Sequence, residues 1–199
     1  ADFAAAAMPR DTELHKAAYK GDADRVISIL EEGEVDVNEF GAANRTALHR
    51  AVAACSSEVV SALIDRGANV DIQDKSGRTP LHWAAVVGAI ECAKLLLNKG
   101  ANINVTSNTG STPLHMAADL GKTDFVAFAL ENNADLTLTD NGGMTPYDLA
   151  KAAGHKDVSK LVNPGGSAGG LCGLCFPFER LFCCLFDTSC CCCFSKPGK

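Results

Sequence analysis

The sequence predicts an all-α solenoid, in which five helix-turn-helix units stack one after another and are joined by β-turn or hairpin loops. A tetrapeptide that begins with threonine recurs every 33 residues, and its first copy stands 34 residues before the second. The copies are Thr12-Glu13-Leu14-His15, Thr46-Ala47-Leu48-His49, Thr79-Pro80-Leu81-His82, Thr112-Pro113-Leu114-His115 and Thr145-Pro146-Tyr147-Asp148. A second series keeps the same step, with the copies Gly67-Ala68-Asn69, Gly100-Ala101-Asn102 and Asn133-Ala134-Asp135. A fixed period of this length is the signature of stacked repeats.

The tetrapeptide predicts where the first helix of each unit begins. The threonine hydroxyl can accept a hydrogen bond from a free backbone N–H of the first turn. Proline suits the next position, because its missing N–H would be unpaired there in any case. Small residues follow, at Ala17-Ala18, Ala84-Ala85 and Ala117-Ala118, and they let neighbouring helices approach closely. The glycines that then end this helix, where a left-handed residue is favoured, are Gly21, Gly88, Gly121 and Gly154.

The second helix of each unit carries larger apolar residues at helical spacing. One helix pair cannot bury this apolar face alone, so each unit must pack against the next. The residues are Val26, Ile27, Ile29, Leu30, Val59, Val60, Leu63, Ile64, Leu95, Leu96, Leu97, Phe125, Val126 and Leu130. With roughly 10 Å for each helix diameter, five units predict a rod on the order of 50 Å long.

Two residues of the second unit replace a glycine of the pattern. Asn44 stands where Gly77 stands in the third unit, and asparagine adopts a positive φ more readily than most residues. Cys55 replaces the glycine that ends the first helix. We expect both residues to be left-handed, at a cost of roughly 1 kcal/mol for the cysteine.

On these markers the chain resembles the ankyrin-repeat family, whose pattern of Thr-Pro-Leu-His-x-Ala plus Gly-Ala is matched from about Asp11 to Val162. The last unit departs from the pattern, since Tyr147-Asp148 replaces Leu-His and its second helix is short and polar. Such departures are typical of capping units. The predicted domains are an N-terminal arm (1–10), the ankyrin-repeat domain (11–162), a Gly/Ser linker (163–170) and a cysteine-rich amphipathic tail (171–199).

Composition limits the partners and the compartment. The net charge is −6, and an acidic body disfavours nucleic acid, because phosphate binding needs a clustered basic surface. Eight of the ten cysteines lie between Cys172 and Cys193. The start of the sequence shows no secretory signal, so we expect a reducing compartment and cysteines that are made as thiols.

The sequence offers little catalytic chemistry. His15, His49, His82 and His115 occupy the same place in successive units, about 10 Å apart, which is too far for one metal ion. We expect them to form hydrogen bonds within and between loops, and we expect Trp83 to serve packing. No nucleophile motif or phosphate-binding loop is present. The sequence therefore predicts a protein that is not an enzyme, with no catalytic residue, no metal site and no cofactor.

The resemblance implies a protein partner bound by the loop tips and the inner helices. Carried over position by position, this surface comprises Tyr19, Lys20, Arg45, Lys75, Ser76, Arg78, Val86, Val87, Asn108, Thr109, Ser111, Asp119 and Leu120. We expect an exposed patch that joins Tyr19, Val86, Val87 and Leu120 to the two arginines, because aromatic, aliphatic and arginine side chains dominate binding surfaces.

The tail has an apolar helical face. Phe178, Leu181, Phe182, Leu185 and Phe186 follow the spacing i, i+3, i+4, i+7 and i+8. The segment is too short and too often charged to span a bilayer, but it can lie at a membrane surface. Cysteines on such a stretch are typical acceptors for S-palmitoylation. The predicted lipidation sites are Cys183, Cys184, Cys190, Cys191, Cys192 and Cys193.

An alternative interpretation gives the tail zinc or redox chemistry. Cys172 and Cys175 have the spacing of metal ligands or of a disulfide-exchange motif, although no histidine lies nearby. The sequence favours an adaptor that binds a protein partner and no nucleic acid, and that is held at the cytoplasmic face of a membrane through the tail. The sequence does not identify the partner, the membrane or the pathway, because a fold does not specify function.

Overall fold

The computed structural model describes residues 10–33 and 35–163. The chain divides into two units, residues 1–164 and 165–199, and only the first contains described residues. The predicted arm up to residue 9, the linker after Asn163 and the whole cysteine-rich tail lie outside the described residues. The predicted division into four segments therefore stays a prediction.

The described residues form ten α-helices and no strand, so the predicted all-α class is confirmed for them. The helices are α1 (Glu13–Lys20), α2 (Ala23–Glu31), α3 (Ala47–Ala53), α4 (Ser57–Asp65), α5 (Pro80–Val87), α6 (Ile90–Asn98), α7 (Pro113–Asp119), α8 (Thr123–Glu131), α9 (Pro146–Ala152) and α10 (Lys156–Leu161). One turn of 3₁₀ helix, η1 (Ala42–Asn44), occupies the loop between the first two repeats. It lies between Gly33 and Thr46, where the 33-residue period gains its one extra residue.

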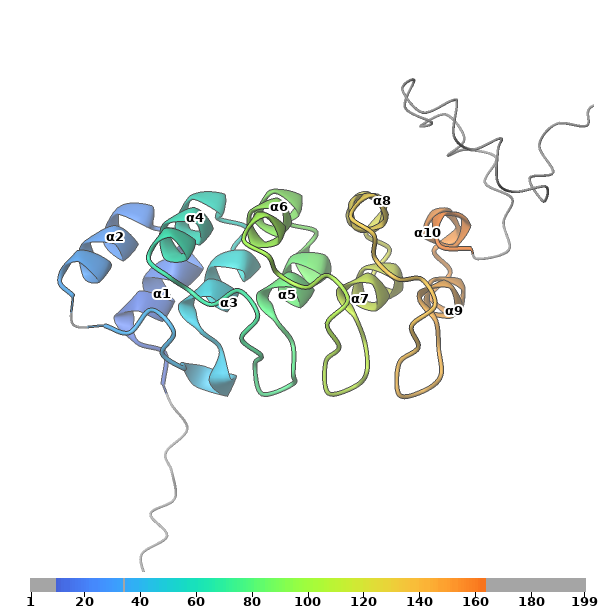
Figure 1. Ribbon diagram of the computed structural model, residues 1–199, viewed down its shortest axis with the longest axis horizontal. Helices are drawn as coiled ribbons and strands as arrows, with labels where there is room; N and C mark the ends of the chain where they lie inside the picture. The colour runs from blue at the N-terminus through green and yellow to red at the C-terminus, as the bar shows by residue number, and fades with distance from the viewer. Residues whose placement is uncertain (1–9, 34, 164–199) are drawn as a thin grey trace, which may run out of the picture. The chain divides into compact units, whose positions relative to one another are not determined.

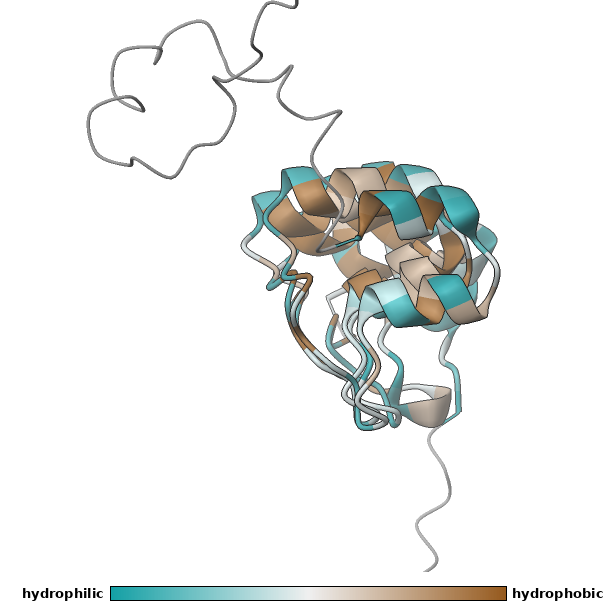
Figure 2. Ribbon diagram, turned by 90° about the vertical axis from the view of Figure 1, so that its right-hand side faces the viewer, coloured by the Kyte–Doolittle hydropathy of each residue, from teal (hydrophilic) through white to brown (hydrophobic). Residues whose placement is uncertain are grey.

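The helices form two layers, as Figure 1 shows. The odd-numbered helices make the inner layer, from which the loops project, and the even-numbered helices make the outer layer. Within the inner layer α1 packs on α3, α3 on α5, α5 on α7 and α7 on α9, and the outer helices pack in the same order. Hydrophobic residues concentrate between the layers, as the end-on view of Figure 2 shows. The predicted stack of five helix pairs is thus confirmed.

In repeats two to four, a histidine makes two hydrogen bonds at the start of the inner helix. In α5 the Thr79 N–H donates to Nδ1 of His82 at 3.1 Å, and Nε2 of His82 bonds the Ser111 carbonyl of the next loop at 3.0 Å. The same two bonds join Thr46, His49 and Arg78, and Thr112, His115 and Met144. The predicted role of the histidines, within and between loops, is confirmed.

The fifth repeat keeps the hydrogen bond at the helix start but has no side-chain bond to a following loop. The Thr145 N–H donates to Oδ2 of Asp148 at 3.1 Å, so aspartate replaces histidine at the helix start. No repeat follows among the described residues, so a histidine here would find no loop carbonyl to bond. Helix α10 has six residues, whereas α8 has nine. The predicted short second helix is confirmed.

The core is built from small residues on the inner helices and larger ones between the layers. Ala51, Ala84 and Ala117 are fully buried, which allows adjacent inner helices to approach closely. The leucine of each of the first four tetrapeptides, such as Leu81, is about 1% exposed. Burial of such a side chain contributes roughly 2 kcal/mol. Tyr147 takes the leucine position in the last repeat and is only half-buried, as expected at the end of a stack.

The loops are tight turns that bond to one another. In the third repeat the Asp74 N–H donates to the Arg78 carbonyl at 2.8 Å, which closes the turn. From one loop to the next, N–H groups donate to carbonyls in the pairs Lys75 to Ala43 (3.0 Å), Asn108 to Ser76 (3.1 Å) and Asn141 to Thr109 (3.0 Å). These bonds align the loop tips in one row along the inner side of the stack.

Left-handed residues occur where the sequence predicts them. Asn44 has φ 55° and Cys55 has φ 57°, and Gly88 at the position equivalent to Cys55 has φ 88°. Ala43 is also left-handed, with φ 61°, and no sequence pattern predicted it. It lies in η1, where the extra residue of the period must be accommodated.

Candidate functional site

The predicted partner-binding residues lie on the loops and at the ends of the inner helices. Tyr19 and Leu120 are the most exposed large apolar residues among them, at 61% and 45%. The exposed polar members are Lys20, Lys75, Ser76, Asn108, Thr109 and Asp119, and the half-buried members are Arg45, Arg78, Val86, Val87 and Ser111.

Some of the loop residues also serve the loops themselves. Asn108 donates from Nδ2 to the Lys75 carbonyl at 3.1 Å. Thr109 donates from its hydroxyl to Oγ of Ser111 at 3.2 Å. A side chain already bonded in this way has less capacity for a partner, so the free candidates at the tips are Lys75 and Ser76.

The predicted apolar patch is divided by the stacking order. Tyr19 and Val86 stand at the same helical position in the first and third repeats, with Ala53 between them in the second. Helix α1 packs on α3 and α3 packs on α5, so α1 and α5 are not neighbours. Val87 and Leu120, in contrast, belong to consecutive repeats and stand at equivalent positions.

The two predicted arginines meet at one indole ring. The Arg45 guanidinium carbon lies 4.3 Å from the centroid of the Trp83 ring, and that of Arg78 lies 4.5 Å from it. Trp83 stands on α5, Arg78 ends the loop before α5, and Arg45 ends the loop before α3. Cation–π contacts at these distances contribute about 0.5–2 kcal/mol each. We call Arg45, Asp74, Arg78 and Trp83 the Arg–Trp cluster.

A buried carboxylate organises this cluster. Oδ2 of Asp74 lies 3.4 Å from Nε of Arg78 and 3.7 Å from Nε of Arg45, and it accepts a hydrogen bond from Nε1 of Trp83 at 3.3 Å. Its other oxygen accepts from the N–H groups of Ser76 and Arg78. Burial of Asp74 raises the pKa of its carboxyl, but these bonds and the charge of Arg78 outweigh that effect and lower it overall. Asp74 is therefore ionised.

A second ion pair lies beside the cluster. Arg50, on α3, donates from Nη2 to both carboxylate oxygens of Asp11, at 2.9 and 2.6 Å. Burial of Arg45, together with the positive charges of Arg50 and Arg78, lowers the pKa of its guanidinium, although Asp74 opposes the shift. The three arginines thus crowd one another, and their Nε atoms are buried without a hydrogen-bond acceptor among the described residues.

Sequence reasoning identified Arg45 and Arg78 but missed the other members of this surface. The sequence predicts packing for Trp83 and gives no role to Asp74 or Arg50. A signal for Trp83 was available: it is the only tryptophan of the chain, at a position that other repeats fill with Lys16, Arg50, Met116 and Leu149. A position that accepts lysine or arginine is not a core position, so the indole had to be partly exposed there.

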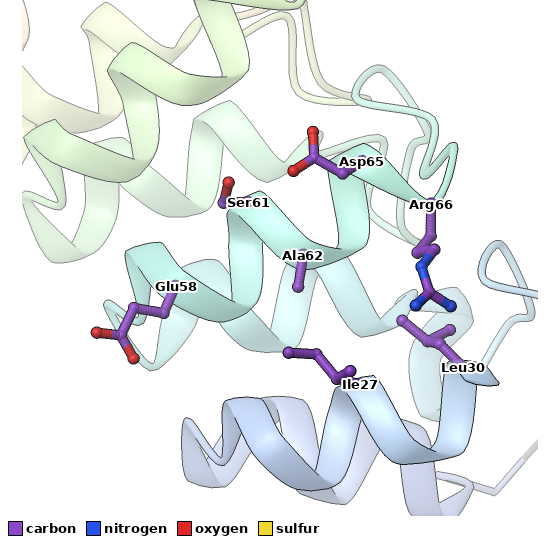
Figure 3. Close-up of a pocket in the computed structure, with 7 residues that line it drawn as sticks. All are labelled: Ile27, Leu30, Glu58, Ser61, Ala62, Asp65 and Arg66. Carbon is purple, nitrogen blue, oxygen red and sulfur yellow. The ribbon is translucent and has the colours of Figure 1, made fainter.

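One hollow of the described surface lies away from this cluster. It is a shallow groove between α2 and α4 on the outer layer, with Ile27 and Leu30 on one side and Ala62 and Arg66 on the other, as Figure 3 shows. Arg66 reaches Glu31 across it, with Nη2 3.4 Å from Oε1. The charged residues that line the groove, Glu58, Asp65 and Arg66, are all exposed, whereas the inner surface holds a buried carboxylate, so we place the candidate site on the inner surface instead.

The described residues also bear on the metal and membrane interpretations. Among residues 10–33 and 35–163, no group of three histidine, cysteine or carboxylate side chains could hold a metal ion. Among the described residues, no helix is both long enough and apolar enough to cross a membrane. Cys55 is exposed and Cys92 is buried, both as free thiols. The predicted lipidation sites and the Cys172–Cys175 motif lie outside the described residues.

Comparison with known families agrees with the repeat geometry. Residues 14–107 match the family pattern described as ankyrin repeats (3 copies), and residues 96–150 match the one described as ankyrin repeats (many copies). The two matches overlap and together run from the first inner helix to α9. The chain therefore belongs to the ankyrin-repeat family.

Proposed function

We propose that this chain is a protein-binding adaptor, which holds a protein partner on its inner helices and loop tips. Ankyrin repeats generally imply protein partners, and ankyrin-repeat proteins are usually binding scaffolds without enzymatic activity. The observation that carries the proposal is the Arg–Trp cluster. Tryptophan and arginine are among the residue types most enriched in side chains that dominate binding energy. Here two arginines stack on one tryptophan ring at a partly exposed site.

The inner surface also meets the mechanical needs of binding. Arg45 and Arg78 are each 25% exposed, and both are fixed by Asp74 and the indole. Side chains that are already ordered lose little entropy when a partner binds. Trp83 stands on α5, and the short loops that carry Arg45 and Arg78 are joined to their neighbours by backbone hydrogen bonds, so the surface keeps its shape in the absence of a partner.

A matched pair of double variants tests this proposal. Arg78→Ala with Val87→Ala alters the inner surface, and Ile27→Ala with Arg66→Ala removes the same kinds of side chain from the outer groove. Peptides selected by the wild-type chain from a displayed library of short random sequences are titrated against all three proteins. We expect the inner variant to bind about thirtyfold more weakly or worse, because a central arginine contributes about 2 kcal/mol or more.

The control decides the interpretation of that result. The outer variant should bind as the wild type does, and thermal melts should show that both variants are folded. Undiminished binding by a folded inner variant would remove the proposal. Equal losses in both variants would mean that the selected peptides do not recognise the inner surface.

We further propose that the tail tethers the adaptor to the cytoplasmic face of a membrane through acylated cysteines. The support is the sequence pattern, in which two cysteines lie within an apolar stretch of helical spacing and four follow it. Several acyl chains give stable anchoring where one does not. The test is hydroxylamine-sensitive acyl labelling of the full chain, with a zinc assay on the same sample. Labelling that disappears when Cys183, Cys184 and the four cysteines at 190–193 become serine supports the tether. Stoichiometric zinc without labelling would favour the thiol or metal alternative.

A further inference from the structure

We infer that the Arg–Trp cluster binds a carboxylate side chain, aspartate or glutamate, of an extended segment of the partner. This inference rests on the proposed function, since it names the partner chemistry that the inner surface accepts. It adds which residues contact the partner and which chemical group of the partner they bind. Arg45 and Arg78 supply the donors, Trp83 holds them, and Asp74 fixes their geometry.

The charge around the cluster is the first argument. Arg45, Arg50 and Arg78 face only the carboxylates of Asp11 and Asp74, which leaves one positive charge without a counter-charge among the described residues. The whole chain has a net charge of −6, so this surface reverses the sign of the molecule. A carboxylate of the partner would supply the missing charge, and opposite potentials across an interface favour both encounter and register.

The unused donors are the second argument. Asp74 lies on the Nε side of both cluster arginines, within ion-pair distance but without accepting a hydrogen bond from either Nε atom. No hydrogen bond from an Nη atom of Arg45 or Arg78 occurs in the part of the chain that is described. Arg50 differs, because its Nη2 is bound by Asp11. A guanidinium is a planar fork that matches a carboxylate with two parallel bonds. The Nη edges of the two cluster arginines therefore retain the capacity for such bonds.

The neighbouring repeats define what accompanies the carboxylate. At the position of Trp83, the fourth repeat has Met116 and the fifth has Leu149, and both are half-buried. The inner surface thus changes along the stack from cationic and aromatic to apolar. Adjacent repeats are about 10 Å apart, and an extended chain advances about 3.3 Å per residue. We expect an apolar partner residue about three positions from the acidic one.

The same charges discriminate against a phosphate group. Asp11 and Asp74 already lie against the arginines, and only one positive charge remains to be balanced. A phosphate carries a charge of about −1.5 to −2 at neutral pH, so it would leave the site with an excess of negative charge beside two fixed carboxylates. A single carboxylate carries one negative charge and neutralises the one remaining positive charge.

The test uses the full chain and a library of random peptides with both ends blocked, so that carboxylates come only from side chains. Each selected peptide is then made in three forms, with the acidic residue, with its amide counterpart, and with phosphoserine in its place. We expect the amide form to bind at least about tenfold more weakly, which corresponds to one charge-assisted bond. This preference should vanish in Arg45→Gln with Arg78→Gln and persist in Arg66→Gln, which removes one arginine charge from the outer groove.

A second measurement guards against a variant that fails to fold. Raising the salt concentration from about 0.05 M to about 0.5 M should weaken binding of the acidic form to the wild-type chain much more than binding of its amide form, because salt screens charge. Equal affinity of the acidic and amide forms, or tighter binding of the phosphoserine form, would overturn the inference. If those peptides still depend on Val87 and Arg78, the proposed function survives. If no peptide is selected, the proposed function fails together with the inference.

Discussion

At the scale of single residues, His49, His82 and His115 act as neutral connectors between repeats. Nδ1 of His82 accepts a backbone N–H, so the ring proton must lie on Nε2, which donates to the Ser111 carbonyl. Protonation of Nδ1 would break the cap and place a charge inside the stack. Burial lowers the pKa of His49 and of His82 to about 4, although the bond to the loop carbonyl partly opposes it.

This gives a prediction for pH dependence. The pKa of an unfolded histidine is about 6.5, and the folded value is lower, so the neutral form is the one that folding favours. The stability from His49 and His82 is fully present above pH 6.5 and is lost as the pH falls towards 4. The full effect is on the order of 3 kcal/mol per histidine. Urea unfolding at neutral pH and near pH 4.5 measures it.

The control is His82→Gln, which cannot titrate. We expect this variant to be less stable than the wild type at neutral pH, and to lose less stability on acidification. If acid destabilises the variant and the wild type by the same amount, His82 is not one of the groups responsible.

Cys55 gives a second prediction at this scale. Its φ of 57° is left-handed, a conformation that costs a residue with a Cβ about 1 kcal/mol relative to glycine. We expect Cys55→Gly to be neutral or to raise the melting temperature. The reverse change at the equivalent position of the next repeat, Gly88→Ala at φ 88°, should lower it. A clear fall for Cys55→Gly would contradict the alignment of this turn with the glycine turns.

At the scale of elements, the loops depend on contact with the loop that follows. A Cβ on Gly77 would lie 2.6 Å from the Asn108 backbone nitrogen and closer still to Oδ1 of Asn108. A Cβ on Gly143, in the last loop, would meet no atom within 4 Å. Both glycines have φ 73°, so their intrinsic strain with alanine is the same and only the neighbouring loop differs.

The two glycines therefore provide a matched pair of variants. Gly143→Ala should cost only the backbone term, about 1 kcal/mol. Gly77→Ala should cost about 2 kcal/mol more, because the Asn108 loop must shift and its bond to the Ser76 carbonyl is weakened. Denaturant unfolding gives both values. Equal losses of stability in the two variants would show that the hydrogen bonds between neighbouring loops contribute nothing measurable.

At the scale of the whole molecule, stability accumulates from neighbour to neighbour along the stack. Each helix pair contacts only the pairs beside it, as α5 contacts α3 and α7. In such an array the free energy of unfolding is close to a sum of repeat and interface contributions. The terminal repeat must then present a polar face, and α10 does so with Lys156, Asp157 and Lys160 exposed.

Two truncations test this arrangement. A chain that ends at Asn163 should melt within about 2 °C of the full chain, because α10 already closes the stack. A chain that ends at Asn132 leaves α7 and α8 without their neighbours α9 and α10, and should melt about 10 °C lower. Thermal melts followed by circular dichroism provide the comparison. A large loss on removal of residues 164–199 would show that the predicted domain boundary is wrong.

Sequence reasoning succeeded where a residue acts on its own backbone. Thr79 and Gly88 bound α5 as predicted, since capping and left-handed turns are settled by the residues themselves. The positive φ values of Asn44 and Cys55 followed from the same register. Ala43 was missed because its conformation is set by the extra residue in the loop and by its bond to Lys75, not by its own preference.

The sequence by itself determined the period, the helix boundaries, the buried faces and the family, because all of these are written in local patterns that repeat. Only the tertiary structure decided which side chains share a site. Arg45 comes from the loop of one repeat and meets Trp83 and Asp74 of the next, and Ala53 separates Tyr19 from Val86. Side chains far apart along the chain converge only after the repeats stack, and the direction of each side chain then depends on the charges it finds there.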